Sequence, residues 1–176
     1  DDAHLELLER GAIRSIEATS ILAHLPEHIA ERELDTVSAL LDRPVDATHV
    51  DVVDKSRSPG NVLFVRVESR SLTETFAVIG RKGLPAEDVA KQVAEQVNDY
   101  LAAGAPVGPH LADQLVVPIA TCDGGAYRTN RVTSHLETQL ALVPKFMPVD
   151  IERIDDEDAT IIRIEQIDYN TEAISE

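Results

Sequence analysis

The sequence is short of aromatic residues, of cysteine and of long apolar runs, and each shortage narrows what the chain can be. Phe, Trp and Tyr make up 3% of the 176 residues and Trp is absent, so the core has to be built from Val, Ile, Leu and Ala. The single cysteine, Cys122, excludes an internal disulfide and fits a reducing, intracellular setting. Cys122 has no partner at catalytic spacing, and we expect it to be a small buried residue.

The chain also lacks a run of apolar residues long enough to span a membrane, and its start has no signal-peptide character. We therefore expect a cytoplasmic protein with no membrane partner. The first residues, Asp1-Asp2-Ala3-His4, do not include a starting Met. We expect from this that the chain is a piece of a longer protein.

Basic residues are scarce, because 16 Lys and Arg stand against 32 Asp and Glu and give a net charge of −16. Such an acidic balance by itself argues against a nucleic-acid partner. An acidic surface with few lysines is also typical of proteins that work in concentrated salt, where the salt screens the self-repulsion. We hypothesise a halophilic source, which predicts a melting temperature that rises with KCl.

Hydrophobic periodicity predicts helices and strands that are mixed along the chain but do not alternate strictly. The expected strands cover residues 14–23, 48–53, 62–68, 73–79, 127–133, 149–154 and 160–164. The expected helices cover residues 27–41, 85–103 and 111–120, the last interrupted or ended near Pro118, and a fourth helix carries His135. The last two strands should form a hairpin around residues 155–158, and the chain should fray from about Asp168. This order predicts an α+β fold with mainly antiparallel or mixed sheets.

The most informative short segment is Ser134-His135-Leu136-Glu137, at the start of an amphipathic helix. Ser134 and Glu137 have the spacing of a capping box, which would place His135 at the first helical position. The positive field of a helix N-terminus favours neutral imidazole, which is a nucleophile, and the same terminus attracts phosphate. The alternative is a plain polar residue in the first helical turn, since capping boxes are common.

Two further groups of polar residues are candidates for binding. Asp113 and Gln114 lie side by side on an expected helix and could read a purine edge or a ribose hydroxyl, although such pairs are also common on solvated helix faces. His24 and His28 have the spacing of helical metal ligands. Because Pro26 lies between them and no third ligand is evident, we predict no metal site in this chain.

Several segments together resemble one known family. Residues 107–118 read VGPHLADQLVVP and are followed by GGAY at 124–127 and SHL at 134–136. The segments HLPEHIAERE at 24–33, SPGN at 58–61 and KFMPV at 145–149 fall in the same order. From about residue 5 to residue 166, the chain resembles RNA 3′-terminal phosphate cyclase.

The resemblance implies an ATP-dependent enzyme that converts an RNA 3′-terminal phosphate to a 2′,3′-cyclic phosphodiester, with release of AMP and pyrophosphate. The reaction would pass through a covalent histidine–AMP intermediate, with His135 as the nucleophile. The residues expected to contact the adenosine are His110, Leu111, Ala112, Asp113 and Gln114. A divalent metal, Mg²⁺ or Mn²⁺, would be needed as well as ATP, and RNA with a 3′-terminal phosphate would be the partner.

The resemblance also implies a fold and a division into domains. The family has a large domain of repeated β–α units, similar to the enolpyruvyl transferases, with a small α/β domain inserted. Residues 1–12 would belong to the large catalytic domain, residues 13–105 to the inserted domain, and residues 106–176 to the C-terminal repeat that carries the nucleophile.

This sequence would correspond to about the C-terminal half of the family's chain. The metal ligands and most of the RNA contacts would then lie in the other half. We therefore expect the isolated piece to be inactive, and the resemblance allows a homodimer.

The sequence departs from the family at two positions near the expected site. His110 stands where the family usually has an aromatic residue, and Gln139 replaces a common Asn. A non-catalytic branch of the family acts in ribosome assembly and lacks the nucleophile, and a plain acidic binding domain is a third alternative. The presence of His135 favours the enzyme.

Overall fold

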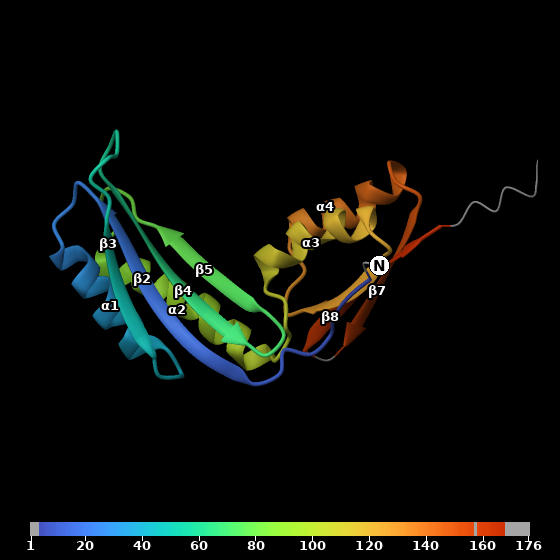
Figure 1. The fold of residues 1–176 in the computed structure, drawn as a ribbon, viewed down its shortest axis with the longest axis horizontal. Coiled ribbons are helices and arrows are strands. Elements are labelled where there is room, and N and C mark those ends of the chain that lie inside the picture. The colour runs from blue at the N-terminus through green and yellow to red at the C-terminus, as the bar shows by residue number, and fades with distance from the viewer. Residues whose placement is uncertain (1–3, 157, 168–176) are drawn as a thin grey trace, which may run out of the picture. The chain divides into compact units, whose positions relative to one another are not determined.

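The computed structural model describes residues 4–156 and 158–167, which separate into two compact units (Figure 1). The central unit consists of residues 10–102. The split unit combines the described residues up to Glu9 with those from Ala103 onward. Glu157, in the hairpin expected around residues 155–158, and the expected fraying from Asp168 lie outside the described residues.

The central unit is a four-stranded mixed sheet with two helices. Its elements are β2 (Ile13–Ala23), α1 (His28–Leu40), β3 (Ala47–Val52), β4 (Gly60–Ser69), β5 (Thr73–Ile79) and α2 (Ala86–Ala103). The strand order is β3-β2-β4-β5, in which β3 pairs with β2 in parallel and the other neighbours are antiparallel. The parallel pair needs a crossover, which α1 supplies.

One face of this sheet forms the core of the central unit together with both helices. Val89, Val93 and Val97 recur at helical spacing along α2 and are buried. They pack with Val37 of α1 and with sheet residues such as Val65 in one apolar cluster. Burying each of these side chains stabilises the fold by roughly 1.5–3 kcal/mol.

Arg10 ties the two ends of the central unit together. Its guanidinium donates to the backbone carbonyls of Tyr100 and Leu101, at 2.7 and 3.0 Å. It also lies 4.9 Å from the centre of the Tyr100 ring, which adds a cation–π contact. The first residue of the unit is therefore held against the last turns of α2.

The split unit is a second four-stranded mixed sheet with its own helices. Its elements are β1 (Leu5–Leu7), α3 (Pro109–Thr121), β6 (Gly125–Thr129), α4 (Ser134–Leu142), the 3₁₀ turn η1 (Val143–Lys145), β7 (Val149–Asp156) and β8 (Ala159–Gln166). The strand order is β1-β6-β8-β7, with β1 parallel to β6 and the other pairs antiparallel. Helix α3 packs on β6 and β8 and against α4, as Figure 1 shows.

The mixed α+β fold class and most of the expected elements are confirmed, but two local predictions are wrong and one strand was missed. Helix α3 continues through Pro118 to Thr121, because one missing N–H removes a single helical hydrogen bond and the Thr121 hydroxyl bonds the Pro118 carbonyl at 2.8 Å. The strand expected at 127–133 begins at Gly125 and ends at Thr129. Strand β1 was not expected, since three residues carry no readable period.

Candidate active site

Helices α3 and α4 begin at the same end of the split sheet. Val107 forms a parallel bridge with Thr129, the last residue of β6, and its N–H donates to the Arg128 carbonyl at 3.1 Å. Helix α3 begins two residues after Val107, and α4 follows the short loop that leaves β6. The two helices also pack together. The segments that carry His110 and His135 therefore both start at the end of the sheet where β6 finishes.

The start of α4 differs from the expected capping box. The Thr133 hydroxyl accepts a hydrogen bond from the Leu136 N–H at 3.1 Å, so Thr133 is the N-cap and Ser134 is already helical. His135 is therefore the second helical residue, and Glu137 lies one position too late to complete the box. Leu136, whose N–H makes this capping bond, is fully buried.

His135 itself is exposed, so a ligand can reach its imidazole. Helix α4 is held through the two residues that follow His135. Leu136 packs inward, and Glu137 lies 3.8 Å from Arg153 on β7. The imidazole thus projects from a helix whose position is set by its neighbours.

The start of α3 presents three of the five expected adenosine contacts on one helical face. Gly108 is the extended N-cap, and Pro109 occupies the first helical turn, where its missing N–H costs nothing. His110 and Gln114 are exposed and Asp113 is half-buried, and their spacing of three and four residues places them side by side. Leu111 is half-buried and Ala112 is fully buried. The N–H of Ala112 donates to the Gly108 carbonyl at 3.0 Å, so Ala112 belongs to the support of this turn.

Tyr127 on β6 supports this turn of α3 from the side of the sheet. Its hydroxyl, buried in the split unit, donates to the Ala112 carbonyl at 2.7 Å. Burial and, to a smaller extent, the carboxylate of Asp113 raise the pKa of Tyr127, so the hydroxyl remains a donor. The sequence contained no signal for this role, because nothing local shows that Tyr127 reaches residue 112.

Three polar groups close to these segments keep unused hydrogen-bonding capacity. Arg128 Nε on β6, Asn130 Oδ1 after it and Gln139 Oε1 on α4 are buried and have no hydrogen-bond partner among the described residues. Gln139 follows His135 by one helical turn and shares its face. Buried polar groups without partners are costly and tend to mark functional sites, which makes this region suited to a polar ligand such as a nucleotide.

The remaining candidate residues lie elsewhere. Cys122 is exposed, and the expectation that it is buried is wrong, because it lies at the C-terminal cap of α3 where the chain turns. His24 precedes α1 and contacts the Ser56 carbonyl at 3.0 Å. Over residues 4–156 and 158–167 no cluster of three or more His, Cys, Asp or Glu could hold a metal ion. Within the same residues no helix combines the length and the apolar character needed to cross a membrane.

Comparison with known proteins identifies a matching family model and several relatives of this chain. Residues 8–102 match the family model of the RNA 3′-terminal phosphate cyclase (RTC) insert domain. The RNA 3′-terminal phosphate cyclase of Koribacter versatilis is 38% identical over 160 residues, which cover 91% of this chain and 45% of that protein. The proteins of the same name from Salmonella agona and Pseudomonas fluorescens are 43% and 41% identical, over 82% and 84% of this chain and 42% and 43% of their own lengths. The chain spans less than half the length of each of these relatives.

Proposed function

The chain belongs to the RNA 3′-terminal phosphate cyclase family, and from this premise we propose that it is part of an enzyme that cyclises RNA 3′-terminal phosphates with ATP. The observation that carries the proposal is the placement of His135. His135 is exposed in the first turn of α4. This helix begins at the same end of the sheet as α3, whose first turns carry His110, Asp113 and Gln114.

The proposed chemistry uses His135 as the nucleophile in three displacements. A ring nitrogen of His135 attacks the α-phosphorus of ATP, an N–P bond forms, and pyrophosphate leaves. An oxygen of the RNA 3′-phosphate then takes the AMP from His135, which regains its free nitrogen. Finally the neighbouring 2′-hydroxyl attacks the activated 3′-phosphorus, loses its proton and expels AMP, which closes the 2′,3′-cyclic phosphodiester.

The other residues of the site would bind and orient the nucleotide. Asp113 and Gln114 offer a carboxylate and an amide to ribose or adenine, and His110 offers a ring for stacking. The N–H groups at the start of α4 favour phosphate there, and Arg128 adds a cation on the adjacent strand. Leu111 would contribute a packing contact, and Ala112, which is fully buried, would support the turn from inside.

The proposal assigns the two units to different parts of the family's architecture. The split unit is the last β–α repeat of an enolpyruvyl-transferase-like large domain, and the central unit is the inserted α/β domain. The parallel pairing of β1 with β6, with the central unit and α3 between them in sequence, supports this assignment. We propose that Mg²⁺ or Mn²⁺ is held by residues of the protein outside this chain, which spans less than half the length of its relatives.

Labelling with ATP that carries radioactive phosphorus at the α position tests the proposal. The full-length protein, with divalent metal and high salt, should retain an acid-labile, hydroxylamine-sensitive label. His135→Asn should remove it, and His28→Asn, an exposed histidine in the central unit, should keep it. A full-length protein that takes up no label would contradict the enzyme. Residues 1–176 alone should cyclise little or no RNA, because the chain spans less than half of its relatives.

A further inference from the structure

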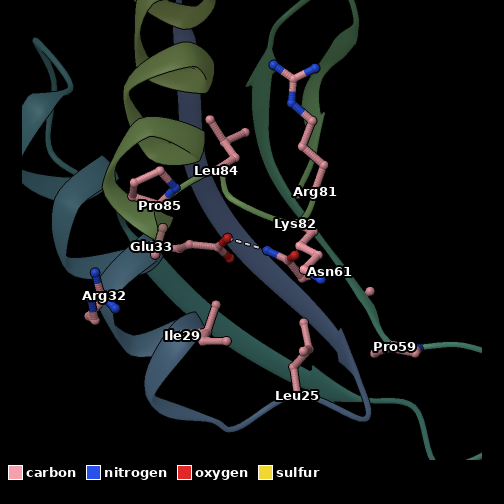
Figure 2. A pocket seen from close by; sticks show the side chains of 13 residues that line it. Leu25, Ile29, Arg32, Glu33, Pro59, Asn61, Arg81, Lys82, Leu84 and Pro85 are labelled. Atoms are coloured by element: carbon pink, nitrogen blue, oxygen red, sulfur yellow. Dashed lines mark hydrogen bonds between the residues drawn. The ribbon is translucent and has the colours of Figure 1, made fainter.

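The central unit contains a pocket that the proposed reaction does not use (Figure 2). It has a volume of about 450 Å³ and lies between α1, the start of β4 and the loop that leads from β5 into α2. This volume is in the range of pockets that hold small organic ligands. All of its lining residues belong to the central unit, so the pocket shares no residue with the candidate active site.

The walls of the pocket are largely apolar, and an amide side chain lies between them. Leu25 and Ile29 line one side and Leu84 and Pro85 the other, as Figure 2 shows. The side chain of Asn61 lies between them. We call the space between these two apolar walls the slot. A heteroaromatic ring has apolar faces and a polar edge, so apolar walls with an amide between them suit such a ring.

Asn61 is held in place by buried neighbours. Its amide donates to Oε1 of Glu33, whose side chain is fully buried, and the Ser20 hydroxyl donates to Oε2 of the same carboxylate at 2.7 Å. Gly80 leaves the space that the amide occupies, since a Cβ at residue 80 would collide with Asn61. Glu33 is therefore a positioning residue, and Asn61 is the group available to a ligand.

The charge around the pocket is opposite to that of the whole chain. Among the lining residues three are cationic, Arg32, Arg81 and Lys82, and one is acidic, Glu33, although the chain carries a net charge of −16. Arg32 is engaged by Glu87 through hydrogen bonds of 2.7 and 2.8 Å. Arg81 and Lys82 are exposed on the loop at the rim, where they would attract an anion into an otherwise repulsive protein.

We propose that this pocket binds a single nucleotide, with the base in the apolar slot and the phosphate at Arg81 and Lys82. Asn61 would hydrogen-bond the polar edge of the base. The bound group is either a free mononucleotide or one unpaired nucleotide of an RNA strand, because both present the same base and phosphate. The site goes beyond the proposed reaction and does not depend on His135.

Titration with AMP, GMP, CMP and UMP, followed by proton–nitrogen correlation spectra of the full chain, tests the proposal. At least one mononucleotide should shift the amides of Gly60 and Gly80, which line the pocket, in a saturable manner. Shifts confined to Gly108, Gly124 and Gly125 would place all binding in the split unit and overturn the proposal. An absence of saturable shifts would overturn it as well.

Two variants distinguish pocket binding from general charge attraction. Arg81→Ala/Lys82→Ala should raise the Kd about tenfold or more, since each cation offers a charge-assisted bond to phosphate. Arg43→Ala/Lys91→Ala removes the same charge from exposed residues that do not line the pocket, and should leave the Kd within about twofold. Equal effects of the two pairs would overturn the proposal.

A steric variant tests the slot itself. Gly60 lies in the wall, and an added Cβ would meet no atom within 4 Å, so Gly60→Leu should fold and should weaken mononucleotide binding. Unchanged binding in a folded Gly60→Leu protein contradicts the proposed slot. His135→Asn should leave the Gly60 and Gly80 shifts intact, so a failed labelling experiment and a failed titration are distinguishable.

The source of the nucleotide is resolved by competition. Inorganic phosphate that binds as tightly as the mononucleotides would overturn base recognition. An RNA hexanucleotide that displaces the mononucleotide and binds more tightly identifies RNA as the ligand. A hexanucleotide that does not compete identifies a free nucleotide, and the pocket remains a nucleotide site.

Discussion

The hydroxyl of Tyr127 on β6 donates a 2.7 Å hydrogen bond to the carbonyl of Ala112 on α3. Ala112 directly precedes Asp113, which is half-buried, and Gln114, which is exposed. The strand therefore fixes the height and rotation of the helical turn proposed to bind adenosine. Tyr127, which would not contact the ligand itself, would in this way position Asp113 and Gln114, which would.

Removing this hydrogen bond with Tyr127→Phe should loosen α3 without emptying the core. The Ala112 carbonyl keeps its place in the helix, so the expected cost is about 1 kcal/mol. Amide hydrogen exchange of residues 109–121 should accelerate by about fivefold, while residues 86–103 of the central unit should not change. Equal rates in α3 for both proteins would show that the hydrogen bond does not stabilise the turn.

Replacing the cap of α4 should distinguish Thr133 from its neighbour. Thr133→Ala removes the acceptor of the Leu136 N–H and should lower the free energy of unfolding by about 1 kcal/mol. Ser134→Ala is the matched control and should be close to neutral, because Ser134 is already within the helix. Urea unfolding followed by circular dichroism measures both. The reverse order of the two costs would restore Ser134 as the cap.

The Gly125→Ala change should disturb the pairing of β1 with β6. A Cβ at residue 125 would collide with the backbone of Leu5, its partner in the parallel ladder. A loss of about 3 kcal/mol is expected, because neither backbone can move without breaking ladder hydrogen bonds. Gly60→Ala, whose Cβ meets no atom within 4 Å, should leave the melting temperature nearly unchanged. A Gly125→Ala protein that melts with the wild type would show that β1 does not contribute.

Stability of the central unit should depend on pH through Glu33. Burial raises the pKa of Glu33 above its ordinary 4.5, and the hydrogen bonds from Ser20 and Asn61 offset part of the rise. Between the ordinary and the raised pKa the folded protein binds more protons than the unfolded chain does. The free energy of unfolding therefore falls as the pH rises through this interval.

Comparison with Glu33→Gln isolates this contribution, because glutamine does not titrate. The stability of the wild type relative to the variant should decline as the pH rises from about 4.5, and should level off once the carboxyl is fully ionised. Urea midpoints at a series of pH values give the difference directly. A difference that increases with pH would mean that the hydrogen bonds outweigh burial.

The sequence predicted the elements whose signals are local. Val89, Val93 and Val97 predicted α2 by spacing alone, and the alternation around residues 62–79 predicted a hairpin that the structure confirms. Short or long-range features were missed. Strand β1 has three residues and exists through its pairing with β6.

The candidate site was predictable in composition and less so in geometry. The helix of His135 was expected, but its cap is Thr133 and not Ser134, because two adjacent hydroxyls both suit an N-cap and the sequence does not distinguish them. The meeting of α3 and α4 depends on the bridge between Val107 and Thr129, which no local pattern contains. The pocket around Asn61 combines three separate segments of the chain, and no spacing in the sequence relates them.

The clamp of Arg10 on the Tyr100 and Leu101 carbonyls has a consequence for the order of assembly. Leu5 and Gly125 must meet across the whole central unit, and closing so long a flexible loop carries an entropic cost. Once the central unit has folded, its first and last residues are already held close together by Arg10. The folded unit then no longer acts as a long flexible loop between Leu5 and Gly125. We therefore expect the central unit to fold first, and the pairing of β1 with β6 in the split unit to form after it.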